Sequence, residues 1–156
     1  GGGLDAGAAV FRRNICACNT NPIELGVDYP LEPGNMRGPT FQGVRELIDS
    51  DPDVYWEPSA NEGKGGPARP DAESPTGWTD VGTATPRVVK LALFDPAEIT
   101  GPGMDYISFN NFALMFLEEM GSMSDPVRAR FMYFAGGEGP PGDVEGPLVL
   151  YLRLVE

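Results

Sequence analysis

The sequence predicts an α+β fold, mainly a sandwich-like antiparallel β-sheet with one short helix near 41–49 and long ordered loops. Apolar residues in the second half form runs typical of strands, whereas residues 41–49 have helical apolar spacing. The 156 residues include 21 glycines and 16 prolines, which favour many turns. Because the apolar residues are clustered and the length fits one unit, we expect a single domain over 1–156.

The first forty residues predict little regular structure. Residues 1–9 are small and rich in Gly and Ala, so we expect an extended arm there. Residues 10–18, VFRRNICAC, fit either a strand or a short helix, and residues 23–29 fit an extended segment. The prolines and glycines of PLEPGNMRGPT (30–40) predict a rigid surface crossing that leads the chain into a helix.

A helix is predicted over 41–49 because Val44, Leu47 and Ile48 fall on one helical face. Thr40 can cap its first turn, and the Asp-Pro step that follows ends it. The next segment, 57–86, is polar and carries glycines and prolines throughout. We therefore expect a long loop over 57–86, and loops of that length are usually functional or mobile.

The second half predicts four apolar runs. Residues 87–94 form a strand, and 106–120 form a long strand with a kink or bulge near Asn110-Asn111. Residues 127–134 and 147–155 alternate in polarity and are typical of a hairpin with a long tip. The expected inward face of its first strand holds Val127, Ala129, Phe131 and Tyr133. The predicted helix or a second small sheet would cover one face of this antiparallel sheet.

Composition excludes several classes of function. The net charge of −12 repels phosphate backbones and anionic headgroups, which disfavours binding to nucleic acid or to a membrane surface. The chain has no histidine, so histidine-based triads and histidine metal sites are excluded. No run of 18 apolar residues predicts a membrane span. Because the chain starts GGGLDAG, we expect an upstream anchor or signal that is missing here.

Cys16 and Cys18 are two positions apart, so on a strand they would share one face. Two thiols are too few for a structural zinc site. We expect either buried free thiols or a local disulfide, and the redox compartment stays open.

Four acids are spaced as in calcium loops, where alternate oxygens converge on one cation. These calcium candidates are Asp49, Asp51, Asp53 and Glu57. The pattern departs from an EF-hand, which needs Gly and Glu where this chain has Val54 and Ala60. We favour a solvated helix end followed by a proline turn as the explanation of these acids. No cofactor is predicted.

Catalytic signals are also few. On a strand, Glu118 and Glu119 point to opposite faces, so they cannot form an acid–base pair with each other. We expect one of them to be exposed and the other to pair with an arginine. Because no nucleophile is spaced with a base, we predict a protein that is not an enzyme.

Large apolar side chains exceed what one face of a thin sheet needs. A two-sided core explains them, and so does an exposed face or edge that pairs with another protein. The interaction candidates are Phe109, Phe112, Phe116, Met132 and Phe134.

Three ordered segments resemble the extracytoplasmic region of TadG-like proteins of the bacterial Tad (Flp) tight-adherence pilus assembly group. They are RRNICACNTNPIELGVDYPLEPGNMRGPTFQGVRELIDSDPDVYW, TPRVVKLALFDP and ISFNNFALMFLEEM. The resemblance covers about 11–120 in patches, whereas 135–156 has no counterpart. It implies one N-terminal membrane anchor, which this sequence lacks, and a domain outside the cytoplasm: periplasmic, at the cell surface or secreted. It also implies a non-enzymatic role in pilus or surface assembly.

The first hypothesis is therefore an extracytoplasmic structural or assembly protein that acts by contacts with protein partners or by self-assembly. The alternative is a secreted binding module whose 57–86 loop engages a glycan or a protein. Binding that requires calcium is one form of this alternative. A third hypothesis is a hydrolase with an all-carboxylate site. A chelator-reversible thermal shift with calcium would favour the second, and clustered carboxylates of raised pKa in a cleft would favour the third.

Overall fold

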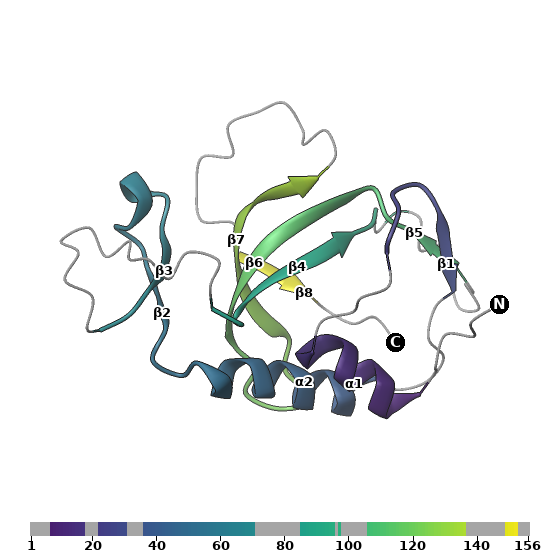
Figure 1. Ribbon diagram of the computed structural model, residues 1–156, viewed down its shortest axis with the longest axis horizontal. Coiled ribbons are helices and arrows are strands. Elements are labelled where there is room, and N and C mark those ends of the chain that lie inside the picture. The colour runs from purple at the N-terminus through teal and green to yellow at the C-terminus, as the bar shows by residue number, and fades with distance from the viewer. Residues whose placement is uncertain are drawn as a thin grey trace.

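The computed structural model describes residues 7–17, 22–30, 36–70, 85–95, 97, 106–136 and 149–152. Its helices are α1 (Ala8–Cys16) and α2 (Arg37–Ser50), with a short 3₁₀ turn, η1 (Asn61–Gly63). The strands are β1 (Asp28–Pro30), β2 (Tyr55–Glu57), β3 (Gly66–Ala68), β4 (Val88–Leu93), β5 (Tyr106–Ser108), β6 (Asn111–Glu119), β7 (Val127–Gly136) and β8 (Val149–Leu152). All strand pairs are antiparallel, so the predicted α+β class, mainly antiparallel sheet, is confirmed (Figure 1).

The main sheet has the strand order β4-β6-β7-β8. The predicted hairpin is present as the pair β7–β8, with Val127 opposite Leu152. Its tip, over residues 137–148, lies outside the described residues. Strand β6 is an interior strand and carries apolar side chains on both faces. Strand β4 pairs along it from Val88 opposite Phe116 to Leu93 opposite Asn111.

Strand β7 departs from the predicted alternation. Val127, Ala129 and Phe131 face the helices as expected, but a register shift against β6 follows Phe131. Phe134 therefore takes the next place in the helix-side core, and Tyr133 is exposed. The sequence pattern missed this because a bulge adds one residue to a strand without changing its composition.

Helices α1 and α2 cover one face of the main sheet (Figure 1). Three buried residues of α2, Val44, Leu47 and Ile48, pack there against β6 and β7. The predicted helix over 41–49 is real but longer, beginning at Arg37. Pro39 lies in its first turn, where backbone N–H groups need no partner within the helix.

Thr40 is therefore inside α2 rather than a cap, and its hydroxyl donates to the carbonyl of Met36 at 2.7 Å. Residues 10–18 also prove largely helical, because α1 reaches Cys16, so the strand alternative is wrong. The expected arm over 1–9 overlaps the start of α1, and residues 1–6 lie outside the described residues.

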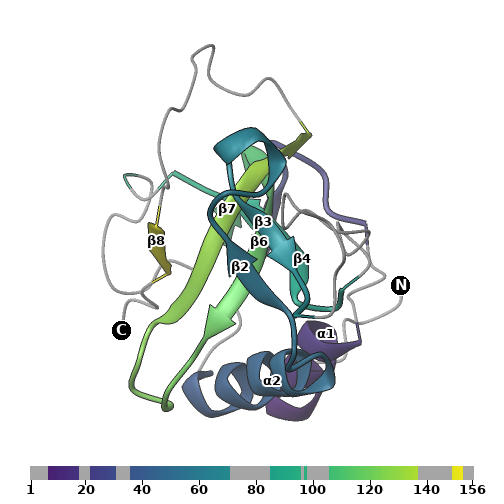
Figure 2. The same cartoon turned by 90° about the vertical axis from the view of Figure 1, so that its left-hand side faces the viewer.

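A hairpin of β2 and β3 covers part of the opposite face of the sheet (Figure 2). Val54 and Phe116 are buried between them, with Trp56, Val88 and Met132 around the contact. The predicted loop over 57–86 is thus wrong for residues 57–68, which hold the end of β2, η1 and β3, and residues 71–84 lie outside the described residues. Gly65 permits the hairpin: its φ is +80°, and a Cβ there would lie 2.6 Å from the Trp56 ring.

The predicted kink near Asn110-Asn111 is where the chain leaves one sheet for another. Strand β5 pairs with β1 in a separate ribbon, and β6 begins only at Asn111. The junction is held by backbone bonds from Gly26 N to Phe109 O and from Asn110 N to Leu93 O, each 2.8 Å. The β1–β5 ribbon and the main sheet are therefore joined through the continuous run of chain from β5 to β6.

The contact between α1 and α2 depends on Gly43. A Cβ at Gly43 would lie 2.8 Å from the Cβ of Ile15 and 3.2 Å from the carbonyl oxygen of Arg12. We expect Gly43→Ala to lower the free energy of unfolding by about 1–3 kcal/mol, because the helices must separate. At Gly38, also in α2, a Cβ would meet only Met123 Sδ at 3.8 Å, so Gly38→Ala should be neutral or stabilising. Urea unfolding of both variants tests this, and equal stabilities would contradict it.

Candidate functional site

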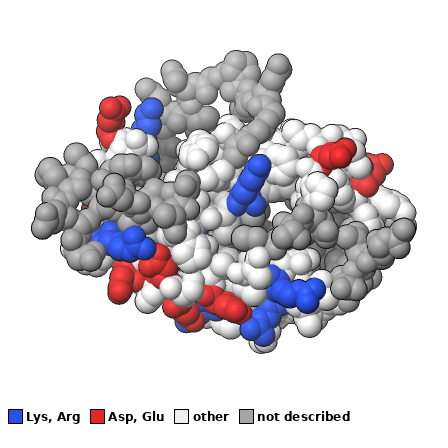
Figure 3. All heavy atoms as spheres, in the orientation of Figure 1, with Lys and Arg blue, Asp and Glu red and all other residues white. Residues whose placement is uncertain are grey.

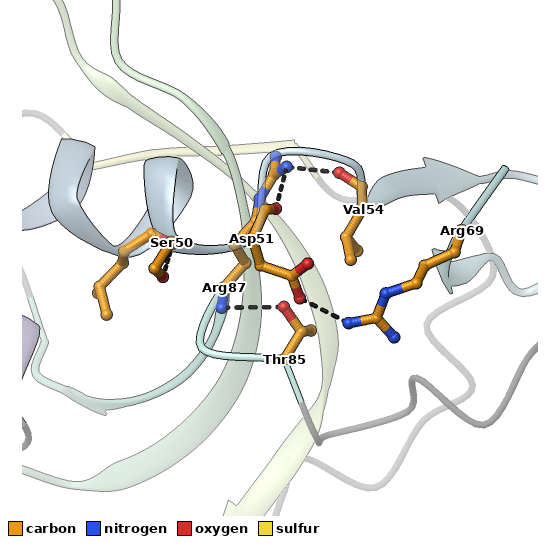
Figure 4. A network of polar contacts seen from close by, with 7 residues as sticks. Ser50, Asp51, Val54, Arg69, Thr85 and Arg87 are labelled. Carbon is orange, nitrogen blue, oxygen red and sulfur yellow. Dashed lines mark hydrogen bonds and ion pairs between the residues drawn. The ribbon is translucent and has the colours of Figure 1, made fainter. Parts of the chain in front are cut away.

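The most buried cation in the described part of the chain is Arg87, which is 6% exposed. Its Nε donates to the carbonyl of Leu117 and its Nη2 to that of Glu118, both at 3.0 Å. Its Nη1 donates to the carbonyls of Asp51, at 3.4 Å, and of Val54 (Figure 4). The guanidinium thus joins the end of α2 to the end of β6.

Several groups hold Arg87 in place. The hydroxyl oxygen of Thr85, itself buried, accepts from the Arg87 backbone N–H at 3.3 Å, and the guanidinium lies 4.8 Å from the centroid of Phe116. Burial lowers the pKa of Arg87, while the carboxylates of Asp51 and Glu118 oppose that shift. Because its donors are taken up by backbone carbonyls, Arg87 is a cross-link of the scaffold.

Two of the four calcium candidates pair with arginines. Asp51 accepts from Arg69 at 2.8 Å, and this contact ties the end of α2 to the end of β3 (Figure 4). Asp49 pairs with Arg45 at 3.1 Å, one turn earlier on α2. Asp51 therefore links two elements of the fold, whereas the pair of Asp49 lies within α2 and is exposed to solvent.

The other two candidates lie apart from that pair. Glu57 accepts bonds from the hydroxyl and the backbone N–H of Ser59, and these bonds lower its pKa. Asp53 is exposed in the turn after α2. Within the described ranges, no group of three or more Asp, Glu, Cys or His side chains is placed to hold a metal ion.

The adjacent acids Glu118 and Glu119 lie where the pairing of β6 with β7 shifts register, so the opposite-face geometry expected of a regular strand does not apply to them. Glu118 accepts from Arg130 Nε at 2.8 Å, and Glu119 pairs with Arg128. As expected, one of the two acids, Glu119, is exposed and the other pairs with an arginine. Glu119 forms an ion pair as well, because Arg128 and Arg130 are two residues apart on β7 and share one face of the sheet.

The interaction candidates are divided among separate places. Phe116 is 0% exposed under the β2–β3 hairpin, and Met132 is next to it. Phe134 packs on the helix side of the sheet. The ring centroid of Phe112 is 4.6 Å from the Nζ of Lys90, and the ring of Phe109 contacts that of Tyr29. The five side chains therefore do not form one surface.

Sequence reasoning missed three exposed apolar side chains, one in the β1–β5 ribbon and two in the segment that precedes β1. Tyr106 is 58% exposed, Val27 42% and Leu25 38%. Apolar residues at alternate positions in IELGVDYP were the available signal, because they indicate an extended segment in need of a partner strand. The pairing of β1 with β5 could not be predicted, because the two strands are far apart in the sequence and no local pattern links them.

A shallow open groove of about 600 Å³ runs beside α1 and α2. It is lined by Arg12, Phe41, Gln42, Arg45, Glu46, Asp49 and Gly121. Acidic and basic side chains are interspersed along this helix-bearing edge (Figure 3). Arg12 bonds Glu46 at 2.8 Å, which lowers the pKa of Glu46 and raises that of Arg12.

Cys16 ends α1 as a half-buried free thiol, and its Sγ lies 3.7 Å from the carbonyl oxygen of Arg13, to which it donates. Cys18 lies outside the described residues. The geometry expected of a strand does not apply to Cys16, since it is helical.

Comparison of the chain with protein-family models, with curated proteins and with solved structures gave no match. Among the described helices, none is long and apolar enough to cross a bilayer. The structure thus defines a mixed α+β domain, mainly antiparallel sheet, in which Asp49, Asp51, Glu118 and Glu119 pair with arginines.

Replacing Arg87 tests its role as a cross-link. We expect Arg87→Met to lower the free energy of unfolding by about 3–5 kcal/mol, because it leaves buried carbonyls without donors. Arg87→Lys keeps the charge, but a single ammonium cannot reach both segments, so its loss should be intermediate. As a control, Arg128→Met removes only the exposed pair with Glu119 and should cost less than about 1 kcal/mol. Equal urea midpoints for Arg87→Met and Arg128→Met would exclude the role.

The Arg12–Glu46 pair predicts a pH dependence. The pKa of Glu46 in the folded protein is below its ordinary value of 4.5. The ionised carboxylate therefore adds to the free energy of unfolding above pH 4.5, and this contribution is lost as the pH falls through the lower folded-state pKa. The difference in unfolding midpoint between the wild type and Glu46→Gln should therefore be constant near neutrality and disappear in acid. High salt should reduce the difference at neutral pH. A difference that grows on acidification would contradict the assignment.

Proposed function

We propose that this chain is a non-enzymatic, extracytoplasmic structural or assembly protein that acts through protein–protein contacts. The system would be a pilus or another surface assembly, as the resemblance to TadG-like proteins implies. Support from the sequence is the order of the three similar segments between residues 12 and 120.

The observation that carries the proposal is the exposed apolar ribbon formed by β1 and β5. Among the described strands, these two pair only with each other. Tyr106 in β5 and Val27 next to β1 expose about half of their surface to solvent, although Ile107, the middle residue of β5, is buried. Exposed apolar side chains gathered on one small element are typical of a surface that contacts another protein.

The polar residues support the same view. Two of the acids that could have served as metal ligands or catalysts are engaged in ion pairs within the fold: Asp51 with Arg69, and Glu118 with Arg130. A side chain that is engaged in an internal ion pair is less available to a substrate. The exposed apolar ribbon is thus the feature that best fits a function.

Photo-crosslinking in the cells that make the protein tests the proposal. A benzoyl-phenylalanine at position 106 replaces Tyr106 with another large aromatic group, and the same probe at Asp53 is the control on an exposed turn. We expect adducts from position 106, but not from position 53, with a surface-assembly protein or a second copy of this chain.

Mass spectrometry identifies the adducts. Absence of any adduct at position 106, or equal adducts at both positions, would contradict the proposal. A substrate turned over by the purified monomer would contradict it as well.

A further inference from the structure

Strand β4 forms one edge of the main sheet, because among the described strands it pairs only with β6. The backbone bonds from Leu117 N to Arg87 O and from Asn110 N to Leu93 O show which residues of this strand turn toward β6. Bonding alternates along an antiparallel pair, so Val89 and Leu91 also turn inward. The backbone groups of Lys90 and Ala92 consequently point outward.

The outward groups of β4 form an open edge in the part of the chain that the structure describes. Only the first of them is occupied, since the N–H of Val88 donates to the carbonyl of Thr85 at 3.1 Å. The backbones of Lys90 and Ala92 each present one N–H donor and one C=O acceptor on this side. The two residues are two positions apart, which is the spacing of hydrogen-bonding residues that an added strand requires.

The side chains of β4 indicate what an added strand would carry. On the helix side of the sheet, Val89, Leu91 and Leu93 are only partly buried against the core. Apolar side chains of a neighbouring strand would cover them. On the other side, Lys90 is exposed, with its Nζ 4.6 Å from the centroid of Phe112, so it is held over the sheet.

Lys90 also selects the charge of the added strand. Two copies of this chain paired through β4 about Lys90 would place like charges opposite each other, which is unfavourable. The net charge of −12 repels a second copy further. An acidic side chain of another protein, by contrast, would pair with Lys90 across the strands.

We propose that the edge of β4 binds an extended segment of a partner protein as an additional antiparallel strand. This segment carries an acidic residue opposite Lys90 and apolar residues on the helix side. The inference rests on the proposed function, for which it supplies one contact and the chemistry of the partner.

Amide hydrogen exchange of the free protein tests whether the edge is open. The N–H groups of Lys90 and Ala92 should exchange quickly, whereas those of Val89 and Leu91 should be protected by β6. Protection of all four amides in the free protein would overturn the inference.

A designed peptide tests the docking itself. The probe is a fluorescent Val-Thr-Val-Asp-Val-Thr-Val peptide with a soluble tag, and its matched control has Lys in place of Asp. We expect saturable binding of the Asp peptide, weakened about fivefold or more by Lys90→Glu, and a reversed preference in that variant. Binding should slow exchange at Lys90 and Ala92.

Backbone methylation separates strand addition from simple charge attraction. N-methylation at the Asp of the peptide removes the donor that faces Lys90 and should abolish binding, whereas N-methylation at a neighbouring Val faces away and should not. Equal effects of the two methyl groups, indifference to Lys90→Glu or absence of saturation would overturn the inference. The crosslinks at Tyr106 are a separate readout, so they can persist when the peptide result is negative.

Discussion

The fold depends on one buried cation, because the guanidinium of Arg87 satisfies carbonyls that no helix or strand can reach. The carbonyls of Asp51 and Val54 lie where α2 has ended and β2 has not begun, and those of Leu117 and Glu118 lie at the end of β6. Buried carbonyls must find donors, and a planar group with several N–H bonds can serve four at once. The hairpin β2–β3 and the helix layer are thereby held to the same strand.

Close approaches of the backbone complete this scaffold. Gly43 lets α1 lie against α2, and Gly65 lets the β2–β3 hairpin turn beneath Trp56. Ion pairs such as Arg12–Glu46 and Arg69–Asp51 then join the same elements at their surfaces. Ion pairs and two close backbone approaches at glycines thus hold small elements together, while Tyr106 of the β1–β5 ribbon stays exposed.

The strands of the second half, their hairpin and the kink at Asn110 were predictable, because alternation and β-branched residues are local signals. The start of α2 was not, since Pro39 resembles a helix break although a first turn tolerates it. Helix α1 could not be predicted with certainty either, because it has no fully buried residue and its packing depends on Gly43 of α2. The ion pair of Asp51, one of the weak calcium candidates, could not be predicted because its partner Arg69 is distant in the sequence.

The irregular pairing of β6 with β7 limits how these two strands can be aligned. Their register shifts at three points, between Phe112 and Ala113, between Leu114 and Met115, and between Leu117 and Glu119. Sliding one strand past the other by a single position would carry Met115 out of the helix-side core and misplace every bulge. A regular ribbon of the same length would have several near-equivalent alignments. These irregularities therefore specify the register of β6 against β7.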